Sequence, residues 1–160
     1  MLFSYFNRDP KNVRNKADIG GGGLLDIGCY PITVSRFIFD GEPTRVTGTF
    51  DRDPKFGTDR IAGGLADFGQ GRHLSFTVST QLAPYQRVNI MGTKGRIEIE
   101  IPFNAPPDQP NRYFVQGMEM NEGTWTSLPV SDQYQLQAEA FGRVILKKQK
   151  PFWGVEDAIQ

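Results

Sequence analysis

Residues 87–101 read RVNIMGTKGRIEIEI, and this stretch decides the fold class. Apolar Val88 and Ile90 alternate with polar residues before the central break, and three isoleucines alternate with two glutamates after it. Alternation with a period of two is typical of a β-strand that buries one face. The residues between the two runs, 91–95, have the composition of a hairpin turn. The stretch therefore predicts two antiparallel strands joined by a tight turn.

The same period extends outward from this hairpin through residues 44–130. It predicts further strands at residues 46–50, 63–68, 74–78, 112–119 and 124–128. An aromatic strand is also expected at residues 1–7, where the chain starts abruptly, so we expect natural sequence upstream of Met1. The content of 12 Phe, 5 Tyr and 2 Trp with 18 Gly and 11 Pro favours strands and turns over a helical bundle.

Helical spacing of apolar residues is confined to residues 24–39, residues 134–146 and a short C-terminal segment at 154–159. Pro31 lies inside the first of these patterns, so the regular helix either restarts there or kinks. Residues 104–111 read as a surface loop. We predict a single α+β domain over residues 1–160, with a large, mostly antiparallel, open-faced sheet and helices packed on one face.

The charge balance excludes several classes of partner. Lys and Arg together number 18, as do Asp and Glu, so the formal net charge is zero. No nucleic-acid footprint or attraction to an anionic membrane follows from that balance. The one cysteine rules out a disulfide within the chain. Without a membrane-span pattern or a signal-peptide core, we expect a cytoplasmic protein with no membrane contact and no metal site.

Residues 20–31, GGGGLLDIGCYP, raise the question of chemistry. A dinucleotide fingerprint requires a buried strand before its glycines and a βαβ unit around them. The preceding residues 14–18 are polar and no second βαβ unit follows, so a phosphate cradle is disfavoured. The simpler interpretation is that the backbone passes close to another surface, where a side chain would clash.

Asp26 and Tyr30 are four residues apart and would share one face of a continuous helix. From the pattern alone, a structural role is favoured: an acidic residue near a helix N-terminus and a partly buried phenol. Cys29 has no base nearby in sequence and is expected to be a small buried side chain. The same reasoning assigns Glu98 and Glu100 to a solvated or partner-facing side of the sheet rather than to a catalytic pair.

Six motifs in order resemble the Gfo/Idh/MocA oxidoreductases. They are Asn-x-Arg at 12–14, the glycine-to-tyrosine segment 20–32, Gly-Glu-Pro at 41–43, Gly-Thr-x-Gly-x-Ile at 92–97, Glu-Ala-Phe at 139–141 and Glu-Asp-Ala at 156–158. The Tyr with flanking Cys and Pro is most similar to the branch that contains dihydrodiol dehydrogenase, D-xylose dehydrogenase and glucose–fructose oxidoreductase. Together these motifs span essentially the whole chain.

The resemblance implies an N-terminal Rossmann domain for NAD(P), absent from this chain, and a C-terminal domain formed by residues 1–160. In this family the open sheet face commonly forms a dimer interface. The implied partners are therefore the protein's own Rossmann domain, further copies of the chain in a dimer or higher oligomer, and a small-molecule substrate. NAD or NADP would bind the full-length enzyme, and we expect neither to bind this fragment alone.

The resemblance also implies roles for individual residues. Tyr30 would be the proton donor or acceptor, assisted by a Lys from the Rossmann domain, and Asp26 would bind substrate or orient Tyr30. Arg14 would contact substrate hydroxyls. The three glycines closest to the helix would let the chain pass beside the nicotinamide end of the cofactor; they are Gly21, Gly22 and Gly23.

The expected function is thus substrate binding and oligomerisation in an NAD(P)-dependent oxidoreductase acting on a sugar, polyol or related CH–OH substrate. The alternative is a non-catalytic ligand-binding or structural dimerisation module that lacks a cofactor domain. The two differ in whether a dinucleotide fingerprint and a Glu-Lys-Pro segment precede Met1 in the gene. The sequence specifies neither the particular substrate nor the choice between NAD and NADP.

Overall fold

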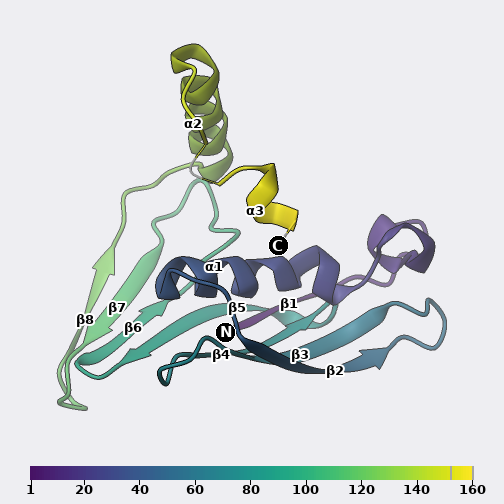
Figure 1. Ribbon diagram of the computed structural model, residues 1–160, viewed down its shortest axis with the longest axis horizontal. Coiled ribbons are helices and arrows are strands. Elements are labelled where there is room, and N and C mark those ends of the chain that lie inside the picture. The colour runs from purple at the N-terminus through teal and green to yellow at the C-terminus, as the bar shows by residue number, and fades with distance from the viewer. Residues whose placement is uncertain (152, 160) are drawn as a thin grey trace.

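A computed structural model describes residues 1–151 and 153–159. The fold is built on an eight-stranded sheet (Figure 1). The strands lie in the order β2-β3-β4-β1-β5-β6-β7-β8. Their bounds are β1 Leu2–Phe6, β2 Arg45–Arg52, β3 Asp59–Asp67, β4 His73–Ser79, β5 Gln81–Gly92, β6 Gly95–Ile99, β7 Arg112–Gln116 and β8 Gly123–Ser127. Among the strand pairs that the described residues form, only that of β1 with β4 is parallel. The predicted α+β fold with a mostly antiparallel open sheet is confirmed.

The hairpin predicted from residues 87–101 is present. Gly92 pairs with Gly95 across the β5–β6 turn, and Val88 pairs with Ile99 further along. Each other strand expected from the alternation is also found, with its ends shifted by a few residues. Alternation follows burial of one face in central strands such as β3 and β4, which forces apolar side chains onto that face. In β2 all eight residues are exposed, and Val46 and Phe50 keep the alternating pattern without being buried.

The first strand of the chain lies in the middle of the sheet. Phe3 on β1 is paired in register with Val78 on β4 and with Gln86 on β5. Its side chain is buried and belongs to the main core cluster, which lies between the sheet and the first helical segment. The buried members of that cluster are Phe3, Ile27, Ala62, Val78, Val88 and Phe103.

The first helical segment consists of two parts. A π-helical turn spans Leu24–Gly28, and the α-helix α1 follows from Cys29 to Phe39 across one face of the sheet (Figure 1). Of the two alternatives at Pro31, the structure shows a restart, which falls two residues earlier than expected. Pro31 therefore lies in the first turn of α1, where its fixed φ is compatible with helical geometry.

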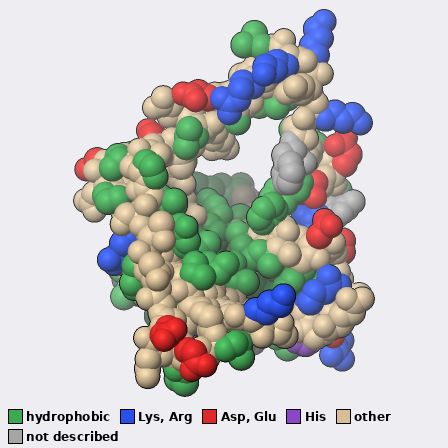
Figure 2. Space-filling model, turned by 90° about the vertical axis from the view of Figure 1, so that its left-hand side faces the viewer, with side chains coloured by type: hydrophobic (Ala, Val, Ile, Leu, Met, Phe, Trp, Pro, Cys, Tyr) green, Lys and Arg blue, Asp and Glu red, His purple; other side chains and the backbone are tan. Residues whose placement is uncertain are grey.

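The helix α2, Gln133–Lys147, projects away from the sheet (Figure 1). Asp132 caps it by accepting hydrogen bonds from the backbone N–H groups of Tyr134 and Gln135. The apolar stripe predicted on this helix is present but exposed, as Phe141 at 65% and Ile145 at 60% show. Hydrophobic side chains also face the hollow below this part of the molecule (Figure 2).

The short helix α3, Val155–Ile159, is tied back to α1 by charge. Arg36 on α1 donates to Asp157 at 2.8 Å and to Glu42 at 2.6 Å. The Glu-Asp-Ala motif at 156–158 therefore supplies an acceptor that fixes the C-terminal segment. Among the described residues, no helix is long and apolar enough to cross a membrane.

Asp53, in the connection between β2 and β3, is expected to make the stability of the chain depend on pH in the acid range. The side chain is fully buried. Hydrogen bonds from the Gln81 side chain and from the backbone N–H groups of Lys55 and Phe56 lower the pKa of Asp53 below its ordinary 3.8. Such a carboxyl stabilises the folded state above its unfolded pKa and loses that contribution as the pH falls through the folded pKa.

We therefore expect the free energy of unfolding to fall from about pH 5 downward, with Asp53 a main contributor. Urea unfolding at a series of pH values measures this dependence. Asp53→Asn removes the titrating group and should flatten the acid slope, whereas Asp108→Asn in the exposed loop is the matched control. An unchanged slope in Asp53→Asn would contradict the assignment.

Candidate functional site

A carboxylate held on both oxygens lies at the π-helical turn. The Oδ2 atom of Asp26 accepts a hydrogen bond from the Tyr5 hydroxyl at 2.5 Å, and its Oδ1 atom accepts one from Arg14 Nε at 2.9 Å. Tyr5 comes from the sheet strand β1, and Arg14 from a 3-10 turn at Val13–Asn15. Because charge-assisted hydrogen bonds from two elements fix the carboxylate, its orientation is set before any ligand arrives.

Tyr30 lies in the first turn of α1 and is half-buried against two aromatic rings. The ring centroid of Phe103 is 4.8 Å from that of Tyr30, and the centroid of Phe3 is 5.5 Å away. Burial raises the pKa of the Tyr30 phenol above 10.0. The neighbouring acidic groups, Asp26 among them, add to this rise in pKa, while the Arg14 guanidinium opposes it. The phenol is therefore neutral at physiological pH and able to donate a proton.

Asp26 and Tyr30 line one cavity of about 790 Å³ between α1, the middle of the sheet and the segment 101–106. Its wall combines apolar and aromatic groups with a small number of hydrogen-bonding groups, which is typical of a small-molecule site. The apolar part comprises Phe3, Ile27, Tyr30, Pro84, Ile101 and Pro106, and the polar part includes Tyr5, Asn7, Arg14, Asp26, Gln86 and Asn104.

The prediction that Asp26 and Tyr30 share one face assumed a continuous α-helix, and this assumption was partly wrong. A continuous α-helix would stack residues four apart, but Asp26 is in the π-helical turn and Tyr30 in α1. They nevertheless face the same cavity. The hydrogen bonds of Asp26 go to Tyr5 and Arg14, and the roles predicted for Asp26 and Tyr30 in catalysis stay predictions.

Tyr5 was missed by the sequence analysis. Its signal was the alternation of β1, which places Tyr5 on the same face as buried Phe3 and therefore toward α1. Arg14, expected to contact substrate hydroxyls, lines the cavity and pairs with Asp26. A substrate contact by Arg14 stays a prediction.

The glycine run passes close to other parts of the chain. A Cβ at Gly22 would lie 2.0 Å from Oδ1 of Asp59, and one at Gly21 would lie 2.6 Å from the backbone oxygen of Lys16. Gly23 is less crowded, with the Asp59 backbone oxygen 3.4 Å from the added carbon. The close approach to another surface is therefore confirmed at Gly21 and Gly22. Whether the three glycines also clear a cofactor stays a prediction.

Cys29, which was considered in the sequence analysis, has a clear structural outcome. Cys29 is exposed, so the expectation of a buried side chain was wrong: Cys29 is the first residue of α1, and its thiol lies 3.6 Å from the backbone oxygen of Asp26. Burial of part of the thiol still raises its pKa, which disfavours a thiolate.

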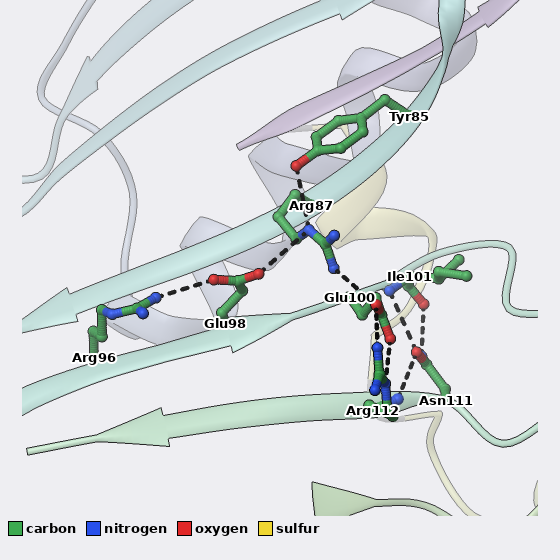
Figure 3. A network of polar contacts seen from close by, with 8 residues as sticks. All are labelled: Tyr85, Arg87, Arg96, Glu98, Glu100, Ile101, Asn111 and Arg112. Carbon is green, nitrogen blue, oxygen red and sulfur yellow. Dashed lines mark hydrogen bonds and ion pairs between the residues drawn. The ribbon is translucent and has the colours of Figure 1, made fainter. Parts of the chain in front are cut away.

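Glu98 and Glu100 lie on the sheet face opposite α1 within a ladder of arginines (Figure 3). Arg112 holds Glu100 with two hydrogen bonds of 2.8 Å, and this pairing lowers the pKa of Glu100. Arg96 donates to Glu98 at 3.0 Å, and Arg87 lies between the two glutamates. Both glutamates are paired with arginines, and their side chains are only 21% and 25% exposed. Glu100 also lines the cavity that Tyr30 faces, so the assignment to a solvated or partner-facing surface stays a prediction.

The Tyr5–Asp26 hydrogen bond leads to a second prediction. Tyr5→Phe removes the hydroxyl and leaves one oxygen of a half-buried carboxylate without this donor, so we expect about 1 to 2 kcal/mol of destabilisation. Urea unfolding of the chain measures it. Tyr113→Phe on β7, where no described residue is a hydrogen-bond partner of the hydroxyl, is the matched control. Equal stability of the two variants would show that the bond contributes nothing.

The sequence of the chain is similar to that of known oxidoreductases. The sequence model of the GFO/IDH/MocA C-terminal domain matches residues 1–98. An uncharacterized oxidoreductase of Rhizobium meliloti is 42% identical over 147 residues, covering 90% of this chain and 44% of that protein. A D-xylose 1-dehydrogenase (NADP(+)) of Haloferax volcanii is 26% identical, over 92% of this chain and 45% of its own length.

Among solved structures, the chain resembles a 3-ketoreductase from Actinomadura kijaniata in complex with NADP and TDP-benzene. The TM-score is 0.86 at 23% identity, over 99% of this chain and 48% of that one. This likeness shows a shared fold. The chain spans about half the length of the curated relatives it matches. The family match covers more than half of the residues, and the chain therefore belongs to the GFO/IDH/MocA family, carrying its C-terminal domain.

Proposed function

We propose that this chain is the substrate-binding and oligomerisation part of an NAD(P)-dependent oxidoreductase that acts on a sugar, polyol or related CH–OH substrate. The observation that carries the proposal is one cavity lined by the neutral Tyr30 phenol and the fixed Asp26 carboxylate. Its partner within the same protein would be an N-terminal Rossmann domain. The greater length of the relatives and the NADP named for two of them support this partner.

The glycine run does not fit the phosphates of a dinucleotide. The N–H of Gly21 donates to the Lys16 oxygen and the N–H of Gly22 to the Arg14 oxygen, both at 2.9 Å, so these donors are already used. We infer that another domain holds the cofactor and that this chain supplies the substrate side. A bound nicotinamide exchanges a hydride with a carbinol carbon.

The side chains of this domain would transfer the proton and bind the substrate hydroxyls. Tyr30 would transfer a proton to or from the reacting oxygen, because it lines the cavity and carries a neutral phenol. The carboxylate of Asp26 has lone pairs beyond those used by Tyr5 and Arg14, and it would accept from a neighbouring substrate hydroxyl. The apolar faces of Phe3 and Phe103 would exclude water from the reacting centre.

The sheet face opposite α1 would bind a second copy of the chain. It carries the arginine–glutamate ladder of Figure 3 and exposed apolar side chains, such as Met91 at 73% and Trp125 at 43%. Mixed charged and aromatic surfaces of this kind suit self-association, because the same patch can offer both signs of charge to its copy. The cytoplasmic location expected from the sequence is part of this proposal.

The experiment is a turnover assay on the full-length protein that contains this chain. Aldoses, polyols, deoxy-sugars and a trans-dihydrodiol are supplied with NAD or NADP, and cofactor absorbance is followed. We expect turnover with at least one member of the panel. We expect the 160-residue chain alone to show no turnover and no micromolar NAD(P) binding by calorimetry. Absence of any activity in the full-length protein would favour a non-catalytic module instead.

A further inference from the structure

A glutamine occupies a position on β5 where the strand pattern calls for an apolar residue. Gln86 is on the same face as the buried Val88 and is paired in register with buried Phe3. A polar side chain on a face that packs against the core is costly unless it is hydrogen-bonded. The structure therefore poses the question of what Gln86 binds.

Gln86 binds the segment that forms one wall of the cavity. Its Oε1 atom accepts hydrogen bonds from the backbone N–H groups of Phe103 and Asn104, both at 3.2 Å. Its Nε2 atom donates to Oδ1 of Asn104 at 3.3 Å. One side chain from a rigid strand thus holds two consecutive residues of a segment that has no regular secondary structure of its own.

The held segment covers Tyr30. Phe103 is 9% exposed, and its ring lies against both Phe3, at 5.5 Å, and Tyr30, at 4.8 Å. Asn104 extends the contact, because its Nδ2 atom lies 3.4 Å from the hydroxyl of Tyr134 at the start of α2. The position of the aromatic cover over Tyr30 is therefore set from β5.

We propose that Gln86 is a positioning residue for Tyr30: by fixing residues 103 and 104, it keeps Phe103 against the phenol ring and so sets the orientation and the solvent exposure of the proton-transfer group. The catalytic part of this inference rests on the proposed function. The structural part does not, since the aromatic contact exists whatever the chain does.

The pKa of Tyr30 can be used to measure how well Phe103 buries the phenol, because the titratable and charged groups that face Tyr30 are separate from Phe103. They are Cys29 and Asp26 from the helical segment, Arg14 from the 3-10 turn and Tyr134 from α2. None of them belongs to the pair Gln86–Phe103. Because burial is the main reason that the pKa of Tyr30 is raised, loosening Phe103 should lower it toward 10.0 with these charges unchanged.

The test is an absorbance titration of tyrosine in the 160-residue chain, with the Tyr30→Phe variant subtracted to isolate Tyr30. Gln86→Met keeps the length of the side chain and removes the acceptor, and it should lower the Tyr30 pKa. Gln109→Met, in the exposed part of the same loop, is the control and should leave it unchanged. Circular dichroism at each pH confirms that the chain is folded. A parental Tyr30 pKa in folded Gln86→Met overturns the proposal.

A second variant covers the case in which Gln86→Met does not fold. Phe103→Leu removes the aromatic cover and leaves the Gln86 acceptor in place, and it should also lower the Tyr30 pKa. An unchanged Tyr30 pKa in Phe103→Leu overturns the proposal by itself.

The catalytic consequence is measured on the full-length enzyme. Gln86→Met should lower kcat about tenfold and shift the alkaline limb of the pH profile, with a smaller effect on KM. If the parent enzyme is inactive, or if Tyr30→Phe leaves kcat intact, the proposed function fails while the titration still decides the structural claim. If the parent is active and Gln86→Met matches it in kcat and pH profile, the positioning role is overturned.

Discussion

Replacing Tyr30 with Phe should lower the kcat of the full-length enzyme by about a hundredfold or more, because the substitution removes the hydroxyl that transfers the proton. The ring would be retained, so its contacts with Phe3 and Phe103 should persist. Substrate binding depends mainly on other groups of the cavity, and KM should change much less than kcat. Steady-state kinetics with the best substrate from the panel provide both constants.

The control for this variant is Tyr113→Phe, which removes a phenolic hydroxyl on β7 outside the cavity. It should leave both constants at the parental values. Thermal unfolding of the two variants should be similar to that of the parent, so that a loss of kcat is not a loss of folded protein. Near-normal turnover of Tyr30→Phe would remove Tyr30 from the mechanism and with it the central claim of the proposed function.

Gly22→Ala should destabilise the chain by about 3 kcal/mol or more, the largest stability effect that we expect from a single methyl group. Gly22 has a φ of +126°, which is unfavourable for any residue with a side chain. In addition, the new carbon would meet Oδ1 of Asp59 at 2.0 Å. Asp59 cannot move freely, because its Oδ2 atom accepts the N–H of Leu24 at 2.7 Å.

Two further variants separate the clash from the backbone strain. Gly57 also has a positive φ, +71°, but no atom lies within 4 Å of an added carbon. Gly57→Ala should therefore cost only about 1 kcal/mol. In an Asp59→Ala background, Gly22→Ala should lose most of its extra cost, since the clashing carboxylate is gone. Urea unfolding measures all of them, and a Gly22→Ala variant as stable as Gly57→Ala would refute the clash.

Alternation and turn chemistry identified most of the fold from the sequence. The period of two located the strands around the 92–95 turn, since a half-buried strand must place apolar residues on one face. Helical spacing located α1 and α2 in the same way. The order of the strands was not predictable, because the parallel pairing of β1 with β4 joins residues 75 positions apart, such as Leu2 and Thr77, and leaves no periodic signal.

The candidate site was predicted in part. Asp26 and Tyr30 were identified by a resemblance and by spacing, and they do face one cavity. Tyr5, Gln86 and Phe103 were not identified, because each acts through a contact with a distant segment: Tyr5 with Asp26, and Gln86 with the 103–104 backbone. Single-sequence patterns report which face a residue occupies and not which residue it meets there.

The sequence by itself determined the class of the fold and the alternating faces of the strands, because these follow from local periodicity and residue type. It identified Asp26 and Tyr30 as candidate site residues through the family resemblance. Only the tertiary structure decided which of those residues meet. It placed Phe103 over Tyr30, joined Asp26 to Tyr5 and Arg14, and brought the Asp59 carboxylate against the glycine run. The physical reason is that such contacts depend on strand order and on close packing between distant segments, neither of which is encoded in any short stretch of the chain.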